Sequence, residues 1–374
     1  MDFARLLIDW QKQHGRHGLP WQVACAPYPV WLSEIMLQQT QVATVIPYYR
    51  RFLERFPDIA VLAAAEEDAV LALWSGLGYY SRARNLHRAA REVAARYGGQ
   101  FPRGFAEILA LPGIGRSTAA AVSVFAFGQR RAILDGNVKR VLARCFAVEG
   151  YPGAKAVENA LWALAERLLP QDGIESYTQG LMDLGASLCA RAKPRCGECP
   201  LAGLCVARRD GRTAELPWRK ARPVLPEKEI ALLVLLDGGE ILLEKRPPTG
   251  IWGGLWSLPE VSLNGDPAQA ALERYGVEAT DFAALPPIRH TFTHFRLHIQ
   301  PLRAEVRRHR PEARQAGAVW LALPDALGAA LPAPVRKLLV AASVAVAARV
   351  ERGRPLSAPA ATDAATGIQR RAES

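Results

Sequence analysis

Four cysteines stand close together in the stretch CARAKPRCGECPLAGLC at 189–205, where six, two and five residues separate them. They are Cys189, Cys196, Cys199 and Cys205. Zinc sites usually contain two close cysteine pairs, whereas only Cys196 and Cys199 are close here. A compact loop with four thiols is typical of a [4Fe–4S] cluster, which binds four thiolates. The spacing therefore favours an iron–sulfur cluster, and zinc or unliganded thiols remain the alternatives.

The rest of the chain gives no sign of export or of a disulfide framework. Cys25 and Cys145 stand alone, and each is expected to be a small buried hydrophobic residue. The N-terminal residues carry charges at Asp2, Arg5 and Asp9 and contain no apolar signal segment. No run approaches the ~18 apolar residues of a membrane span. We therefore expect a cytoplasmic protein, in which structural disulfides are rare.

The charge balance indicates the kind of partner. The chain has 47 Lys and Arg residues against 36 Asp and Glu, for a formal net charge of +11. A surplus of this size suits a polyanion such as nucleic acid, and a charge that only maintains solubility is the alternative. Arg191, Lys193 and Arg195 lie between the cysteines, so a metal bound there could shape a loop that presents cations to phosphate groups.

The first part of the chain has the pattern of an all-α domain, which we expect over residues 1–206. Apolar residues recur at helical spacing in VWLSEIMLQQTQVATVI and STAAAVSVFAF, and Pro and Gly mark the boundaries. The segment 207–228 is polar, basic and contains Pro, and we expect it to be a linker. The tail at 350–374, rich in Ala, Pro, Arg and Ser, is expected to be disordered.

Residues 229–345 predict a second, α+β domain, so the fold class is multidomain. IALLVLLDGGEILLEKR contains two apolar runs around Asp-Gly-Gly, which predicts a β-hairpin. RHTFTHFRLHIQPLRAEV alternates like a single half-buried strand. Helices are expected near 267–275 and 333–349.

The stretch LPGIGRSTAAA at 111–121 follows one expected helix and opens another. Gly113 and Gly115 let backbone amides approach an anion, and the following helix adds its positive end. No G-K-[ST] sequence follows, which argues against a triphosphate-binding loop. The functional interpretation is a helix-hairpin-helix that grips the DNA backbone independently of sequence. The alternative is an ordinary turn between two helices.

Two carboxylates have surroundings that suit catalysis. Glu34 lies among apolar residues in VWLSEIMLQQ, which would raise the pKa of its carboxyl and let it donate a proton near neutral pH. Asp135 precedes an expected helix in AILDGNVKRVLAR. One protonated and one ionised carboxylate can cleave a glycosidic bond through an oxocarbenium-like state. The alternatives are an exposed Glu in the first turns of a helix and an Asp that only caps a helix.

Taken together, these motifs resemble a known family. LPGIGRSTA, LDGNVKRVLAR and the cysteine loop are similar to the helix-hairpin-helix DNA glycosylases that carry a [4Fe–4S] cluster. WLSEIMLQQTQV and GLGYYSRARNLH narrow the resemblance to the adenine DNA glycosylase family, over roughly residues 5–345. The resemblance implies removal of adenine mispaired with 8-oxoguanine or guanine after base flipping. It also implies a monomer that acts on double-stranded DNA in the bacterial cytoplasm, at the nucleoid.

The resemblance implies roles for single residues. Glu34 would protonate adenine N7, Asp135 would stabilise the oxocarbenium ion, and Asn137 would help to hold the sugar and phosphate. The other residues would form the adenine pocket or contact DNA, and two of the latter would fill the gap left by the flipped base. The pocket residues are Leu19, Trp21 and Gln179; the DNA contacts are Gln38, Gln39, Tyr79, Gly113, Gly115 and Ser117, with Gln39 and Tyr79 filling the gap.

Ser117 separates this chain from glycosylases that also cut the strand. Relatives with lyase activity place a nucleophilic Lys at this position, where its amine attacks C1′. Ser117 therefore predicts a monofunctional glycosylase that leaves an intact abasic site. The alternatives are a bifunctional pyrimidine glycosylase with AP lyase activity and a non-catalytic iron–sulfur protein that binds DNA.

The second domain resembles the Nudix-like domain of the same family. A working Nudix hydrolase needs the glutamates of R-E-x2-E-E to hold Mg²⁺, but the chain reads AQAALERYG there and keeps only Glu273. We therefore expect this domain to bind rather than to hydrolyse.

The expected ligand of the second domain is 8-oxoguanine. Phe292, Thr293 and His294 match the family's loop that reads this base, in which Ser is commoner than Thr at the middle position. We expect four residues on one face of a single strand, and a solvated or DNA-facing strand is the alternative. These residues are His290, Phe292, His294 and His298.

Overall fold

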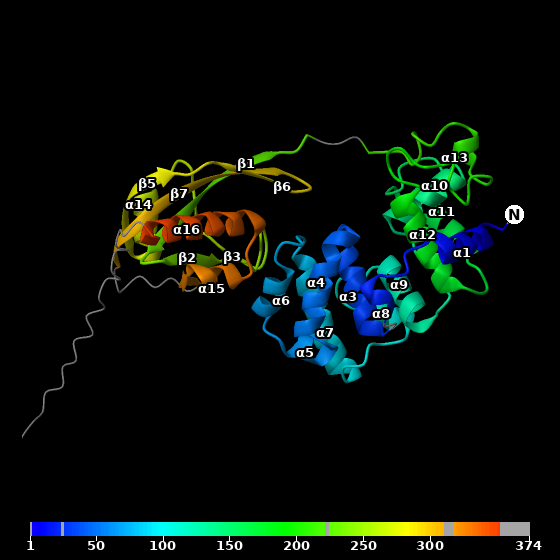
Figure 1. Ribbon diagram of the computed structural model, residues 1–374, viewed down its shortest axis with the longest axis horizontal. Helices are drawn as coiled ribbons and strands as arrows, with labels where there is room; N and C mark the ends of the chain where they lie inside the picture. Colours follow the sequence, from blue (N-terminus) through cyan, green and yellow to red (C-terminus); the bar gives the residue numbers. More distant parts are fainter. Residues whose placement is uncertain (1, 24–25, 221–223, 310–316, 352–374) are drawn as a thin grey trace, which may run out of the picture. The chain divides into compact units, whose positions relative to one another are not determined.

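The computed structural model describes residues 2–23, 26–220, 224–309 and 317–351. Contacts within the chain divide it into two compact units, residues 1–223 and 224–374. The first is built from α-helices and the second around a β-sheet (Figure 1). This confirms the predicted fold class. Within the described residues, no helix has both the length and the apolar character needed to span a membrane.

The helices of the first unit begin and end at capping residues. Asp2, Asp58 and Asp135 each accept a backbone N–H at the start of a helix. Gly98 and Gly128 end two helices in the left-handed conformation that favours glycine. The helices are α1 (Phe3–His14), α2 (Pro20–Val23), α3 (Pro27–Leu37), α4 (Val42–Arg55), α5 (Ile59–Ala64), α6 (Glu67–Trp74), α7 (Ser81–Tyr97), α8 (Phe105–Ala110), α9 (Arg116–Phe127), α10 (Gly136–Cys145), α11 (Lys155–Arg167), α12 (Ile174–Ser187) and α13 (Val206–Arg209).

Helices from the two ends of this unit share one core. Leu7 of α1 is buried together with Val138 of α10 and Leu184 of α12. Gly180 permits the close approach of α1 and α12, because a Cβ at this position would lie 3.0 Å from Leu7 Cγ. This packing brings the segment after α1 next to α12, although the two are far apart in the sequence.

The second unit is organised around a mixed sheet in which the strand order is β3-β2-β1-β7-β5. β1 pairs in parallel with β7 and antiparallel with β2. Leu233, Leu235 and Leu242 of the sheet form a core with Tyr275 of α14. The elements are β1 (Glu227–Asp237), β2 (Glu240–Lys245), β3 (Trp256–Ser257), β4 (Glu260–Val261), α14 (Pro267–Tyr275), β5 (Val277–Ala284), β6 (Ile288–Thr291), β7 (Arg296–His309), β8 (Ala318–Ala322), α15 (Leu323–Gly328) and α16 (Ala333–Glu351).

The β1–β2 hairpin and helices α14 and α16 confirm the corresponding predictions. The single strand predicted over residues 289–306 is wrong. The chain instead forms β6, turns over residues 292–295 and returns as β7. The turn is closed by Phe292 N, which donates to Phe295 O at 2.9 Å. Its sequence contains no Gly, Pro or Asn, so the usual turn signals were absent.

The hairpin formed by β6 and β7 also shows that one prediction is wrong, namely that His290, Phe292, His294 and His298 share one face of a single strand. His290 lies opposite Leu297, and His298 lies opposite Arg289. Directly opposed residues share a face of the sheet and neighbouring positions alternate. His290 and His298 therefore lie on opposite faces, and Phe292 and His294 belong to the turn.

The segment predicted to be a linker, 207–228, is partly incorporated into the two units. Ala207 and Leu216 are buried in the first unit, and β1 begins at Glu227. Arg144 Nε donates to Leu216 O at 2.9 Å, which anchors this polar stretch on α10. A linker is therefore confined to fewer residues than predicted. Most of the predicted tail, 352–374, lies outside the described residues.

Candidate active site and cluster loop

A cavity of about 410 Å³ lies in the first unit, between the segment after α1 and helices α3 and α12. Leu19, Trp21 and Gln179, the predicted pocket residues, line it, and so does Glu34. Leu19 and Trp21 are buried, and the Trp21 ring packs edge-on against Tyr49, with 5.3 Å between ring centroids. The structure thus brings a candidate proton donor and three candidate pocket residues to one site.

Glu34 is held by α3, whose neighbouring residues Ser33 and Ile35 are buried. Burial of the carboxyl, with a smaller effect from the negative charge of Asp135, raises the pKa of Glu34 to about 8. The group is therefore protonated at neutral pH and can serve as a general acid. The alternative interpretation, an exposed Glu in the first turns of a helix, is therefore wrong.

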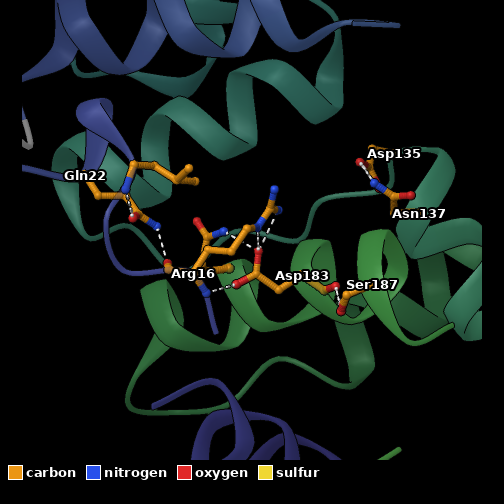
Figure 2. Close-up of polar contacts among 8 residues, drawn as sticks. Arg16, Gln22, Asp135, Asn137, Asp183 and Ser187 are labelled. Carbon is orange, nitrogen blue, oxygen red and sulfur yellow. Dashed lines mark hydrogen bonds and ion pairs between the residues drawn. The ribbon is translucent and has the colours of Figure 1, made fainter. Parts of the chain in front are cut away.

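Asp135 is the N-cap of α10 and is also partly buried. Its Oδ1 accepts from Val138 N at 2.7 Å, and its Oδ2 accepts from Asn137 Nδ2 at 3.4 Å (Figure 2). Burial raises the pKa of Asp135, and these hydrogen bonds oppose that shift. Because its charge acts on Glu34, the two carboxyls belong to one electrostatic site. Asp135 can therefore cap α10 and also take part in chemistry, because its hydrogen bond to Val138 N leaves its charge close enough to act on Glu34.

Asn137 connects the N-terminal end of α10 to the cysteine loop. Its Oδ1 accepts from Arg140 Nη2 at 2.9 Å, and Arg140 Nε donates to Cys189 O at 2.7 Å. Gly185 lies directly against Asn137, because a Cβ on that glycine would come within 2.5 Å of Asn137 Cβ. Packing of α12 against α10 thus requires a residue without a side chain here.

Gln39 and Tyr79 both have the left-handed backbone conformation, with φ of +58° and +50°. Residues other than glycine rarely adopt it, and such strain is concentrated at functional sites. Arg82, which is buried, ties the two segments together: its Nη1 donates to Met36 O at 2.9 Å and its Nη2 to Gly78 O at 3.3 Å.

The predicted hairpin joins α8 to α9. Gly113 has φ of +78°, and a Cβ there would lie 2.7 Å from Asn85 Cβ. Gly115 is the N-cap of α9, and both glycines are exposed. Ser117 Oγ accepts from Leu134 N at 3.0 Å, so the hairpin is bonded to the residue that precedes Asp135. Gln38 Nε2 donates to Thr118 Oγ1 of α9 at 3.3 Å, which links the segment after α3 to the same helix.

All four cysteines of the predicted cluster line one small cavity, together with the buried Cys145. Arg144 Nη1 donates to Cys189 Sγ at 3.4 Å, which supplies positive charge beside a thiol. In the described ranges, no three His, Cys, Asp or Glu side chains are placed to hold a single metal ion. Thiols distributed around a cavity suit a cluster of several atoms better than a lone zinc ion. Cys25 lies outside the described residues.

Comparison with protein families finds three matches. Residues 32–167 match the HhH-GPD superfamily of base excision DNA repair proteins, residues 190–205 the iron–sulfur binding domain of endonuclease III, and residues 231–341 the NUDIX domain. The order of these matches is the order of the helical unit, the cysteine loop and the sheet unit.

Comparison over the whole chain is more specific. The chain is 36% identical over 338 residues to an adenine DNA glycosylase of Buchnera aphidicola subsp. Baizongia pistaciae, covering 90% of this chain and 95% of that protein. The chain belongs to the adenine DNA glycosylase family. This glycosylase is also 34% identical to the adenine DNA glycosylase of Homo sapiens over 400 residues, covering 90% and 73% of the two chains. A solved thermostable thymine-DNA glycosylase is 32% identical, with a TM-score of 0.50, covering 56% of this chain and 95% of that chain.

The family match decides the identity of the cofactor. This glycosylase carries a [4Fe–4S] cluster, which when bound supplies bonds that order the loop at 189–205. The residues that would hold it are Cys189, Cys196, Cys199 and Cys205. Arg140 and Arg144 would then link the loop to α10 and, through Asn137, to the N-terminal end of that helix.

In the second unit, Phe292, Thr293 and His294 lie in the turn between β6 and β7, where Thr293 and His294 are exposed. The Phe292 ring stacks on Phe295, with 4.4 Å between centroids, and lies 6.1 Å from the buried Trp252. Packed aromatic side chains thus support two exposed polar side chains, Thr293 and His294. Such a surface suits recognition of a flat, polar ring.

Two arginines of the second unit form ion pairs with carboxylates near the segment AQAALERYG. Arg274 follows Glu273, and its Nη2 lies 2.9 Å from Glu244 Oε2. Arg246 Nη1 lies 2.7 Å from Glu260 Oε2. Two carboxylates of this region are therefore neutralised by guanidinium groups. That the domain binds rather than hydrolyses stays a prediction.

Proposed function

We propose that this chain is a monofunctional DNA glycosylase that hydrolyses the N-glycosidic bond of adenine mispaired with 8-oxoguanine or guanine. The observation that carries the proposal is the position of Glu34, which lines one cavity with Leu19, Trp21 and Gln179. Burial and the charge of Asp135 both raise the pKa of this carboxyl, as a proton donor requires. A non-catalytic DNA-binding protein has no need of such a pair. The protein is proposed to act as a monomer on duplex DNA in the cytoplasm.

The reaction follows from these groups. The target adenine is flipped into the cavity, and Gln39 and Tyr79 fill the gap in the duplex. Glu34 donates its proton to adenine N7, so that the C1′–N9 electron pair leaves with a neutral base. Asp135 stabilises the positive charge that develops on the sugar until water adds at C1′ and loses a proton to the Glu34 carboxylate, and Asn137 helps to hold the sugar and phosphate. The products are free adenine and an abasic site.

A basic cavity of about 420 Å³ beside the N-terminus of α10 supports DNA binding at this end of the site. Cations from α10, the cysteine loop and the segment after α13 line it, and with the exposed glycines of the hairpin they would hold phosphates independently of sequence. The cationic residues that would do so are Lys139, Arg140, Arg191, Arg219 and Lys220. Arg144 also lines the cavity, but it is buried and its guanidinium is bonded to backbone oxygens.

Substrate choice is tested by single-turnover base release from duplexes with adenine opposite 8-oxoguanine, guanine or thymine. Release from the first two pairs and at least tenfold slower release from the third is the expected result. Equal rates on all three pairs would contradict recognition of the mispair, and release of thymine from a thymine–guanine pair in preference to adenine would reassign the base.

Recognition of 8-oxoguanine is assigned to the turn at 292–294. We predict that His294→Ala lowers the preference for 8-oxoguanine over guanine by about 3–10-fold, because one or two hydrogen bonds are lost. Thr293→Ser is the matched control, since it keeps the hydroxyl, and it should leave the preference unchanged. The measurement is the ratio of single-turnover rates on the two mispairs, and an unchanged ratio in His294→Ala would remove the turn from the proposal.

A further inference from the structure

A buried carboxylate that was not identified from the sequence is bonded to two residues that line the base cavity, Arg16 and Gln179. Asp183 of α12 has only 3% of its side chain exposed. Its Oδ2 accepts from Arg16 N at 2.8 Å, and its Oδ1 accepts from Arg16 Nε at 2.6 Å and from Gln179 Nε2 at 2.8 Å (Figure 2). Arg16 Nη2 also lies 2.6 Å from Oδ1. Each of these partners is an N–H donor, so the carboxylate acts as an acceptor only.

This arrangement fixes which end of the Gln179 amide faces the base. A side-chain amide has one donor end and one acceptor end and can rotate to exchange them. Because Asp183 accepts the amide N–H of Gln179, the exchanged orientation would place two oxygens together. Among the described residues, none donates to Gln179 Oε1, and that oxygen is not among the buried polar atoms without a partner. The oxygen is therefore available to the cavity that Gln179 lines.

A carbonyl oxygen at this place selects a donor on the base. Adenine carries its N6 amine next to N7 on one edge of the ring. If N7 meets Glu34, the amine lies on the same edge, within the cavity that Gln179 also lines. Guanine carries an oxygen at the corresponding position, which would face Gln179 Oε1 without a hydrogen between them.

We propose that Asp183 is a specificity-determining positioning residue, which holds the Gln179 amide so that its oxygen accepts from the N6 amine of adenine. This inference rests on the proposed function. Arg16 supports the same arrangement by bonding both oxygens of Asp183. Gln22 fixes that segment in turn, since its Nε2 donates to Arg16 O at 2.8 Å and its Oε1 accepts from Leu19 N at 3.0 Å.

The test compares adenine with purine, which lacks the N6 amine, each opposite 8-oxoguanine in the same duplex. For wild type and Asp183→Asn, the measured quantity is the ratio of single-turnover release rates for the two bases. The asparagine side chain of this variant can donate to Gln179, which lets the Gln179 amide reverse. Asp183→Asn should lower the adenine-to-purine ratio about 3–10-fold, as expected for one hydrogen bond, mainly through a slower rate on adenine. A loss of active enzyme alone would lower both rates equally.

Two further variants make the result specific. Ser187→Ala is the matched control, because Ser187 Oγ donates to the backbone oxygen of Asp183 and not to its carboxylate; it should leave the ratio unchanged. Gln179→Ala should lower the ratio to the level of Asp183→Asn, and the double variant should lower it no further. Equal loss on both bases, or additive effects in the double variant, would overturn the inference.

The outcome also separates this inference from the proposed function. If the wild type releases adenine and the ratio is insensitive to Asp183, only the role of Asp183 is overturned. If the wild type releases no adenine, the proposed function and this inference are both overturned. If Asp183→Asn does not fold, an unchanged ratio in Gln179→Ala overturns the inference.

Discussion

Replacement of Glu34 by Gln should lower the single-turnover rate of adenine release by about 10²–10⁴-fold, the range for loss of a general acid. Gln has nearly the same shape, so the affinity for a duplex with adenine opposite 8-oxoguanine should change little. Rate and affinity are measured on the same duplex by quenched-flow sampling and by titration. A variant that releases adenine at the wild-type rate would exclude Glu34 as the acid.

The raised pKa of Glu34 gives this prediction a dependence on pH. The acid must be protonated, so the wild-type rate should fall as pH rises through about 8, and the residual rate of the Gln variant should not show this loss. The pKa of Glu34 is about 8 in the folded protein and 4.5 in the unfolded chain. The free energy of unfolding is therefore highest below pH 4.5, and it falls as pH rises from 4.5 to 8, because only the folded state keeps the proton in this range. The Gln variant should therefore be more stable than wild type at pH 7, by about 3 kcal/mol, because each pH unit between 4.5 and 7 costs the wild type about 1.4 kcal/mol. A less stable variant would contradict the burial on which the acid role depends.

Replacement of Asp135 by Asn should lower the rate by about 10²–10³-fold, because the charge that stabilises the oxocarbenium ion is lost. Asn caps helices about as well as Asp, so α10 and the melting temperature should be nearly unchanged. The Asp135 charge also raises the pKa of Glu34, and its removal should move the alkaline loss of the residual rate to lower pH.

Asp135→Ala separates capping from chemistry. It removes the hydrogen bond to Val138 N as well as the charge, so it should lose about 1 kcal/mol of stability in addition. Its rate should nevertheless match that of Asp135→Asn. If Asp135→Asn keeps activity within tenfold of wild type while Asp135→Ala loses it, capping rather than charge is the function of this residue.

Local sequence contained most of what was needed to find the chemical groups. The apolar neighbours of Glu34 predict its raised pKa, since residues adjacent on a helix share its environment. The cysteine loop and the hairpin at 111–121 are each formed by one continuous stretch of sequence. The spacing of the residues within each stretch therefore indicates what it can bind. Asp135 is ambiguous from the sequence because an N-cap and a catalytic carboxylate have the same local sequence. The structure shows the capping hydrogen bond, and this bond is compatible with the proposed chemical role.

Long-range partners could not be predicted in this way. Arg16 and Asp183 meet only because α1 packs on α12. The sequence near either residue gives no sign of its partner. A charged residue within the apolar helix sequence GLMDLG was the one available signal. Arg82 was missed for the same reason, since its partners are backbone carbonyls of other segments. The β6–β7 turn was missed because its sequence continues the alternation of the strands.

The most direct test of the central claim is a single-turnover assay on duplex with one adenine opposite 8-oxoguanine, in which half of each sample is heated in alkali. The enzyme is used with its cluster loaded. Hydrolysis by Glu34 and Asp135, with Ser117 in place of a lyase lysine, predicts adenine release with strand breakage only after alkali. Strand breakage at the rate of base release without alkali would contradict the account, and so would the absence of base release.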